Sequence, residues 1–154
     1  MSEATVRASI VTLVEAVTDI GKVYNRQPSI TTWDKFLTFF KTRIGKVDYI
    51  RGWTVSCEAI AREGLILGGA RDSIRQAHYT YKIRGYHTVN HDKNTENTML
   101  LLALAVMDAL DGGIVSGNVY TAELAQLPTY QHRFFGDILC HYAEITQVVT
   151  EQLT

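Results

Sequence analysis

The stretch QAHYTYKIRGYHTVNHDKNTENTMLLLALAVMDAL, residues Gln76–Leu110, contains the two strongest structural signals in the chain. Its first part, Gln76–His87, alternates apolar and polar side chains, which predicts a β-strand with one buried and one solvent-facing side. Its last part, Glu96–Leu110, is apolar around nearly its whole circumference. This pattern predicts a helix that lies against a sheet on one side and against something else on the other. The polar residues Thr88–Asn94 between the two parts predict a turn.

The chain before this stretch predicts two helices and a further strand. Apolar residues recur at steps of three and four over residues 4–24, which indicates an amphipathic helix. A second, shorter helix with an aromatic face is expected to begin at Thr31 or Thr32 and to end at Gly45. Residues Val47–Arg62 are rich in β-branched and aromatic side chains, which favour a strand.

The chain after the quoted stretch predicts an irregular segment and a last strand. Residues Ile114–Tyr130 lack a clear period, and Gly117 and Pro128 favour a hairpin or an extended arm. Residues Arg133–Glu151 predict one long strand, interrupted or bulged near Glu144. Consecutive strands without a helix between them favour antiparallel pairing. The expected fold is therefore α+β: a small mixed or antiparallel β-sheet covered by helices on one face, with a hairpin or extended arm.

Length and composition predict a single domain over residues 1–154. The chain is 46% hydrophobic and 20% charged, which is typical of a globular protein. Its net charge of −1 lacks the positive surplus of a nucleic-acid-binding protein. The longest apolar run, Met99–Met107, is shorter than the roughly 20 residues that span a bilayer. Residues 1–20 also lack the pattern of a signal peptide, so we expect no membrane association.

Two groups of side chains raise the question of a metal site or a catalytic dyad. His87, His91 and Asp92 lie close together in the sequence HTVNHD, but a zinc site needs three or four converging ligands. No fourth ligand accompanies them, so a polar turn is the favoured interpretation. The neighbours Cys140 and His141 cannot form a nucleophile and base pair on a strand, because successive side chains point to opposite faces.

The sequence gives equally little evidence for other kinds of catalytic or binding site. The sequence has no phosphate-binding, serine hydrolase or metalloprotease motif, and Glu58 and Glu63 cannot be told from surface charges. The aromatic and basic residues around Tyr79–Tyr86 suit a sheet with interleaved core and solvent faces better than a base-stacking platform. Cys57 and Cys140 are expected to be free, buried thiols. The sequence therefore predicts no enzymatic activity, no catalytic residue, no metal site and no cofactor.

The second half of the chain resembles the tail terminator and tail-completion proteins of long-tailed bacteriophages. The resemblance rests on three segments: the strand ending IRGY at Ile83–Tyr86, the helix MLLLALAVMDAL at Met99–Leu110, and FFGDILCHYAEI at Phe134–Ile145. It covers roughly residues 47–151, and its motifs are patterns of residue type.

This resemblance implies a homohexameric ring that docks on the last ring of tail tube protein, stops tube growth and presents its other surface to the head connector. DNA would pass through the lumen without specific binding. The protein would be found in the tail or neck of the virion, and in the host cytoplasm during assembly. The short helix near Phe36 and the segment 114–130 have no counterpart in the resemblance. Another neck component, such as a head-closure or connector protein, is therefore the alternative, and a small enzyme or metal-binding domain is the third.

A closed ring needs two different contact patches on each subunit. An expected loop over Glu63–Asp72 carries an apolar trio that is costly to leave in water. Nearby arginines are expected to bind acidic groups on a neighbouring subunit or to face a DNA-carrying lumen, and exposed strand edges can pair with another chain. The candidate interface residues are Leu65, Ile66, Leu67, Arg71, Arg75 and Arg84.

Overall fold

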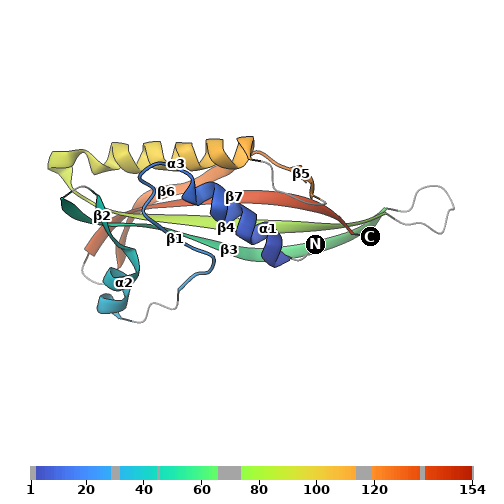
Figure 1. Ribbon diagram of the computed structural model, residues 1–154, viewed down its shortest axis with the longest axis horizontal. Coiled ribbons are helices and arrows are strands. Elements are labelled where there is room, and N and C mark those ends of the chain that lie inside the picture. Colours follow the sequence, from blue (N-terminus) through green and yellow to red (C-terminus); the bar gives the residue numbers. More distant parts are fainter. Residues whose placement is uncertain are drawn as a thin grey trace.

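The computed structural model describes residues 3–28, 32–44, 46–65, 74–113, 119–135 and 138–153. In chain order its elements are α1 (Glu3–Glu15), β1 (Lys22–Tyr24), α2 (Trp33–Phe40), β2 (Lys41–Ile44), β3 (Val47–Leu65), β4 (Ile74–Thr88), a short 3₁₀ helix (His91–Lys93), α3 (Thr95–Gly112), β5 (Val119–Ala122), β6 (Gln126–Phe135) and β7 (Ile138–Leu153). Helices pack on a mixed sheet, which confirms the predicted α+β class (Figure 1).

The sheet has the strand order β1-β3-β4-β7-β5, with β2 on β3 and β6 on β7. β1 is parallel to β3, and the other pairs are antiparallel. β4 is the central strand, because it pairs with β3 on one side and with β7 on the other over nearly its whole length. A bulge between Cys57 and Ala59 interrupts the β3–β4 register. β3 and β4 extend together beyond the ends of the helices (Figure 1).

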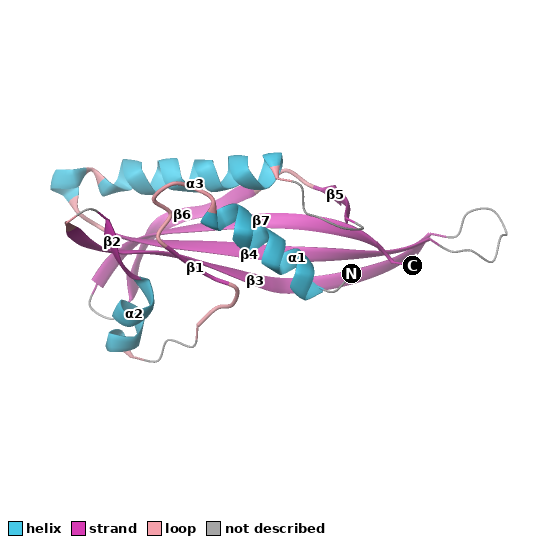
Figure 2. Ribbon diagram, in the orientation of Figure 1, coloured by secondary structure: helices cyan, strands magenta, loops and turns pink. Residues whose placement is uncertain are grey.

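One face of the sheet is covered by α1 and α3. Figure 2 shows α3 running along the long strands while α1 crosses them. The stripe Val6, Ile10 and Val14 of α1 is fully buried, and each such side chain contributes about 1.5–3 kcal/mol through burial. The largest side chains buried between the sheet and the two helices are Trp53, Tyr81, Ile10, Ile83, Met99 and Ile145.

The other face carries a smaller apolar cluster at one end, under α2. Phe36 and Phe40 pack on Tyr86, with ring centroids 6.0 and 4.9 Å apart, and Phe135 stacks on Phe36 at 5.0 Å. Gly52 permits this approach, because a Cβ there would collide with the Phe40 ring. The expectation of helices on one face therefore holds for α1 and α3, whereas α2 covers an aromatic patch on the opposite face.

Two short strands replace expected helical residues. The helix predicted over residues 4–24 ends at Glu15, and Lys22–Tyr24 instead pairs with β3 as β1. Gly21 allows this change of direction: its φ is +88°, and a side chain there would collide with the backbone of Arg51. The helix expected to end at Gly45 ends at Phe40, because the next four residues pair with the start of β3 as β2.

The last strand also differs from the expectation. Residues Arg133–Phe135 belong to β6, which forms a hairpin with β7, so Arg133–Glu151 is not one strand. The two residues between β6 and β7 are Gly and Asp, a hairpin turn sequence that the strand prediction overlooked. An irregularity expected near Glu144 is present on one side of β7: the β6–β7 register shifts between Gln126 and Thr129, opposite Thr146 and Glu144, with the extra residue on β6. The β4–β7 pairing on the other side runs without a register shift. The predicted hairpin or arm over residues 114–130 is realised in its described part as β5 and the start of β6.

Candidate interaction surfaces

The six predicted interface residues do not make one surface in the described part of the chain. Ile66, Leu67 and Arg71 lie outside the described residues, and so does the side chain of Leu65, the last residue of β3. Arg75 is exposed at the start of β4. Arg84 lies nine residues further on, about 30 Å away along the strand at roughly 3.3 Å per residue, and on the opposite face. Arg75 and Arg84 therefore belong to different parts of the molecule.

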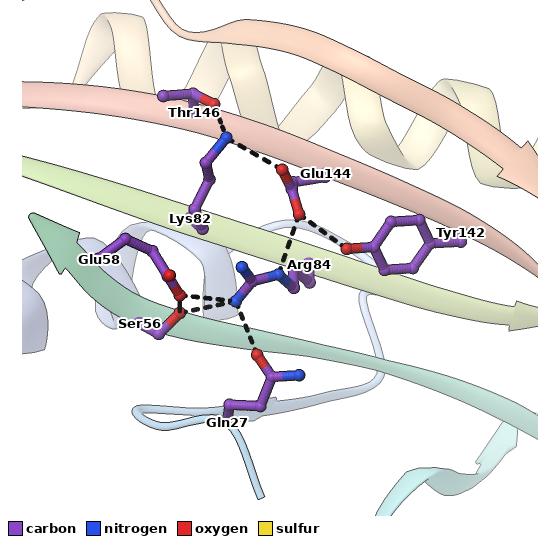
Figure 3. Close-up of polar contacts among 8 residues, drawn as sticks. All are labelled: Gln27, Ser56, Glu58, Lys82, Arg84, Tyr142, Glu144 and Thr146. Carbon is purple, nitrogen blue, oxygen red and sulfur yellow. Dashed lines mark hydrogen bonds and ion pairs between the residues drawn. The ribbon is translucent and has the colours of Figure 1, made fainter. Parts of the chain in front are cut away.

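Arg84 is the centre of a polar network on the open face of the sheet (Figure 3). Its Nε donates to Glu144 Oε2 at 3.0 Å, and its Nη1 donates to Glu58 Oε1 at 3.0 Å. Nη1 also lies within hydrogen-bond distance of Ser56 Oγ and Gln27 Oε1, at 2.9 and 2.7 Å. The partners come from β3, from β7 and from the segment after β1. Arg84 is thus engaged by groups of its own chain.

Glu144 joins a second cation to this network. Lys82 Nζ lies 2.9 Å from Glu144 Oε1 and also donates to Thr146 Oγ1 at 2.8 Å. The Tyr142 hydroxyl donates to Glu144 Oε2 at 2.8 Å. Figure 3 shows Lys82 and Tyr142 approaching Glu144 from different sides. Three neighbouring strands are therefore joined across the sheet by side chains as well as by backbone hydrogen bonds.

The hydrogen bonds of the network keep its two carboxyl groups ionised at neutral pH. Burial alone would raise the pKa of Glu144, but hydrogen bonds from Lys82, Tyr142 and Arg84 outweigh it and lower the pKa to about 2. Hydrogen bonds from Arg84 and Ser56 lower the pKa of Glu58. The carboxylates of Glu144 and Glu58 therefore stay ionised at neutral pH and compensate the positive charges of Arg84 and Lys82. A general acid or base works best with a pKa near the operating pH, so this arrangement suits a structural role.

The histidines predicted as part of a polar turn are separated by the fold. His87 is buried in β4: its Nδ1 lies 2.7 Å from the Thr88 carbonyl oxygen, and its Nε2 lies 2.8 Å from Arg51 Nη2. Burial lowers the pKa of His87 to about 4, so the ring is neutral and accepts the hydrogen bond from the guanidinium. The side chain of His91 is not among the described parts of the structure. The described residues contain no group of three potential metal ligands.

Cys140 and His141 point to opposite faces of β7, which confirms the strand argument against a dyad. His141 Nε2 lies 3.1 Å from the hydroxyl of Thr95 at the start of α3. Cys140 is buried on the other face beside the aromatic residues under α2, and burial raises the pKa of its thiol to about 12. Cys57 is also a free thiol, but it is only partly buried.

The outer face of α3 is an apolar surface that the residue-level prediction missed. Leu100, Leu101 and Leu104 are exposed on this face, and Leu101 is 57% exposed. An open cavity of about 640 Å³ lies beside this face, between α3 and the end of α1. Arg51 and Leu101 are among its lining residues. The signal was present in the sequence, since a helix that is apolar all round needs a second partner besides its own sheet.

The sheet has open edges on both flanks. Among the described residues no strand pairs with the outer side of β3 beyond Thr54, and none pairs with the outer side of β6. Open edges present unpaired backbone groups, as the sequence analysis expected. β6 also exposes Phe134 to 73%, which the sequence analysis did not single out as a contact residue. An aromatic residue at an alternating position of an edge strand was the available signal.

The described helices include none with the length and apolar character needed to cross a membrane. The sequence matches no protein-family model, and it matches none of the curated proteins compared with it.

Proposed function

We propose that this chain is a structural virion protein: a bacteriophage tail terminator that assembles into a homohexameric ring, caps the tail tube and joins the tail to the head connector. The proposal extends the resemblance of the second half of the chain. The three segments that carry the resemblance are the end of β4, most of α3, and the β6–β7 hairpin. They are contiguous in the fold, because β7 pairs with both β4 and β6 and packs beneath α3.

The observation that carries the proposal is the presence of two unlike exposed surfaces on one chain. The first is the apolar outer face of α3 with the cavity beside it, and the second is the β6 edge with its exposed Phe134. A head-to-tail ring uses two different patches on each subunit, and an exposed apolar patch on a folded domain usually marks a contact surface. Together they supply the two halves of a heterologous interface.

The charges of the chain are compatible with the proposed role around DNA. The net charge is −1, and the two cations at the centre of the open sheet face are compensated by two carboxylates. Tight, non-specific DNA binding draws its affinity from uncompensated Lys and Arg. A lumen through which DNA passes without being bound tightly does not need uncompensated Lys and Arg side chains.

The experiment that tests the function is a tube-capping assay. The tail tube protein encoded in the same genome is polymerised with and without the purified chain, and tube lengths and ends are measured by negative-stain microscopy. We expect shorter tubes whose ends carry an additional ring. An unrelated α+β domain of similar size, added at equal concentration, serves as the control. Unchanged tube lengths with bare ends would refute the terminator assignment.

Another neck component remains the second candidate, and α2 is the observation that favours it. This helix and its aromatic cluster lie on the sheet face opposite to α1 and α3, and the resemblance has no counterpart for them. A head-closure or connector protein would bind the head connector and leave tube growth unaffected. Binding of the purified chain to each partner separately, measured by sedimentation, distinguishes the two roles.

A further inference from the structure

One wall of the cavity beside α3 is the turn that joins α1 to β1. The turn contributes four lining residues, Ala16, Val17, Thr18 and Asp19, and α3 lines the opposite side. The chain reverses sharply here, since Asp19 and Gly21 have φ values of +58° and +88° in the left-handed region. Such a turn keeps its shape only where the surrounding structure fixes it.

The side chain of Arg51 fixes this turn from the sheet. Arg51 is buried on β3, and its Nη1 donates to the Asp19 carbonyl oxygen at 2.9 Å. Its Nη2 lies 2.8 Å from Nε2 of His87, the register partner on β4. The guanidinium group is planar and rigid, so Nη2 cannot move away without moving Nη1. The contact with His87 therefore helps to keep Arg51 on the turn.

The neighbours of His87 determine which of its nitrogens carries the hydrogen. Nδ1 lies 2.7 Å from the carbonyl oxygen of Thr88. A carbonyl oxygen only accepts, so Nδ1 is the donor, and Nε2 presents its lone pair to Arg51. A second proton has to bind Nε2, where it points at an N–H of the guanidinium group. Two positively charged donors cannot share one hydrogen bond, so protonation of His87 breaks this contact.

The surroundings of His87 restrict its protonation to acid conditions. Arg51 faces the ring from β3, and His141 faces it from β7 with the two ring centroids 6.3 Å apart. Helix α3 adds the uncharged hydroxyl of Thr95 beside His141, and the turn after α1 contributes Asp19, whose side chain is exposed. Burial, and then the positive charge of Arg51, lower the pKa of His87 to about 4. The ring is therefore neutral at pH 7.5.

We propose that Arg51 and His87 form a pH-dependent latch on the cavity wall: neutral His87 keeps Arg51 on the turn at Asp19, and protonation of His87 releases the turn. The released wall is free to move away from α3. The cavity belongs to one of the two surfaces assigned to the ring, so the latch makes that surface sensitive to acid. This consequence for assembly rests on the proposed function, whereas the latch itself is a property of the single chain.

Hydrogen–deuterium exchange of the wall segment, residues 16–21, tests the latch. Exchange is measured by mass spectrometry at pH 7.5 and pH 5 and corrected for the intrinsic effect of pH on amide exchange. The released ring regains its ordinary pKa of 6.5 against about 4 in the latched state, so opening of the segment should increase about 30-fold between the two pH values. Helix α2, on the other face of the sheet, is the internal control and should exchange equally at both.

Three variants, each verified to be folded by circular dichroism, separate the latch from a general effect of acid. His87→Gln keeps an acceptor for Arg51 but cannot be protonated, so its wall segment should show no increase. Arg51→Met lacks the latch and should exchange rapidly at both pH values. His78→Gln is the matched control: His78 lies on the opposite face of β4, with Nδ1 2.9 Å from Thr150 Oγ1, and its replacement should leave the increase intact.

The outcomes distinguish the latch from the ring. An increase below about 3-fold in the wild type, or an increase that persists in His87→Gln, would overturn the latch and leave the proposed ring standing. A full increase in a chain that never forms rings, as recorded by native mass spectrometry, would support the latch and refute the ring. If Arg51→Met does not fold, the comparison of His87→Gln with His78→Gln decides the question alone.

Discussion

The substitution Glu144→Gln is expected to destabilise the protein at neutral pH, and to do so less as the pH falls. Hydrogen bonds from Lys82, Tyr142 and Arg84 overcome the effect of burial and hold the carboxyl pKa at about 2, against an ordinary 4.5. A depressed carboxyl pKa adds stability that is fully present above pH 4.5 and is lost as the pH falls towards 2. At about 1.4 kcal/mol for each tenfold change in acidity, the ionised Glu144 contributes about 3 kcal/mol at pH 7.

The assay is the free energy of unfolding in urea, measured for the wild type and the variant at several pH values. We expect a difference of about 3 kcal/mol at pH 7 and about 1.4 kcal/mol at pH 3, because the carboxyl of the unfolded chain is then already protonated. Glu63→Gln is the control: Glu63 is 63% exposed and faces His78 at 3.6 Å, so its loss should cost less than about 0.5 kcal/mol. A difference below about 1 kcal/mol at pH 7, or an equal difference at both pH values, would refute the assignment of the network.

Further substitutions test the packing of the core and the buried His87. Gly85→Ala should cost about 1–3 kcal/mol in urea unfolding, because the added Cβ would lie 2.7 Å from Met99 and from the Trp53 ring. Gly64→Ala meets open space and should be nearly neutral, so equal effects would contradict the packing. Burial lowers the pKa of His87 to about 4, so His87 removes about 2 kcal/mol of stability between pH 7.5 and pH 5, as the unfolded ring binds a proton that the folded ring does not. His87→Asn should flatten this part of the pH profile, and an unchanged profile would show that His87 is not its source.

The sequence predicts the elements whose pattern is long. Alternation of apolar and polar side chains predicts β4, and a long run of apolar helix-forming residues predicts α3. β1 and β2 are not predictable in the same way. Each is three or four residues long and is defined by pairing with β3, a contact that no local period encodes.

The polar network and the exposed apolar surfaces could not be predicted from the sequence, because both depend on contacts between distant segments. Arg84 and Glu144 are 60 residues apart in the chain, so their pairing depends on the register between β4 and β7. The sequence indicated that α3 needs a second partner, but the cavity beside it arises only where α1 ends. Phe134 lies on an open edge only because β6 forms a hairpin with β7. The sequence analysis predicted one continuous strand there and therefore did not place Phe134 at an edge.

The central claim is that this protein works by assembling into a ring, and native mass spectrometry of the purified chain, alone and mixed with tail tube protein, tests it most directly. We predict a homohexamer in at least one of the two samples. A chain that stays strictly monomeric in both would contradict the claim.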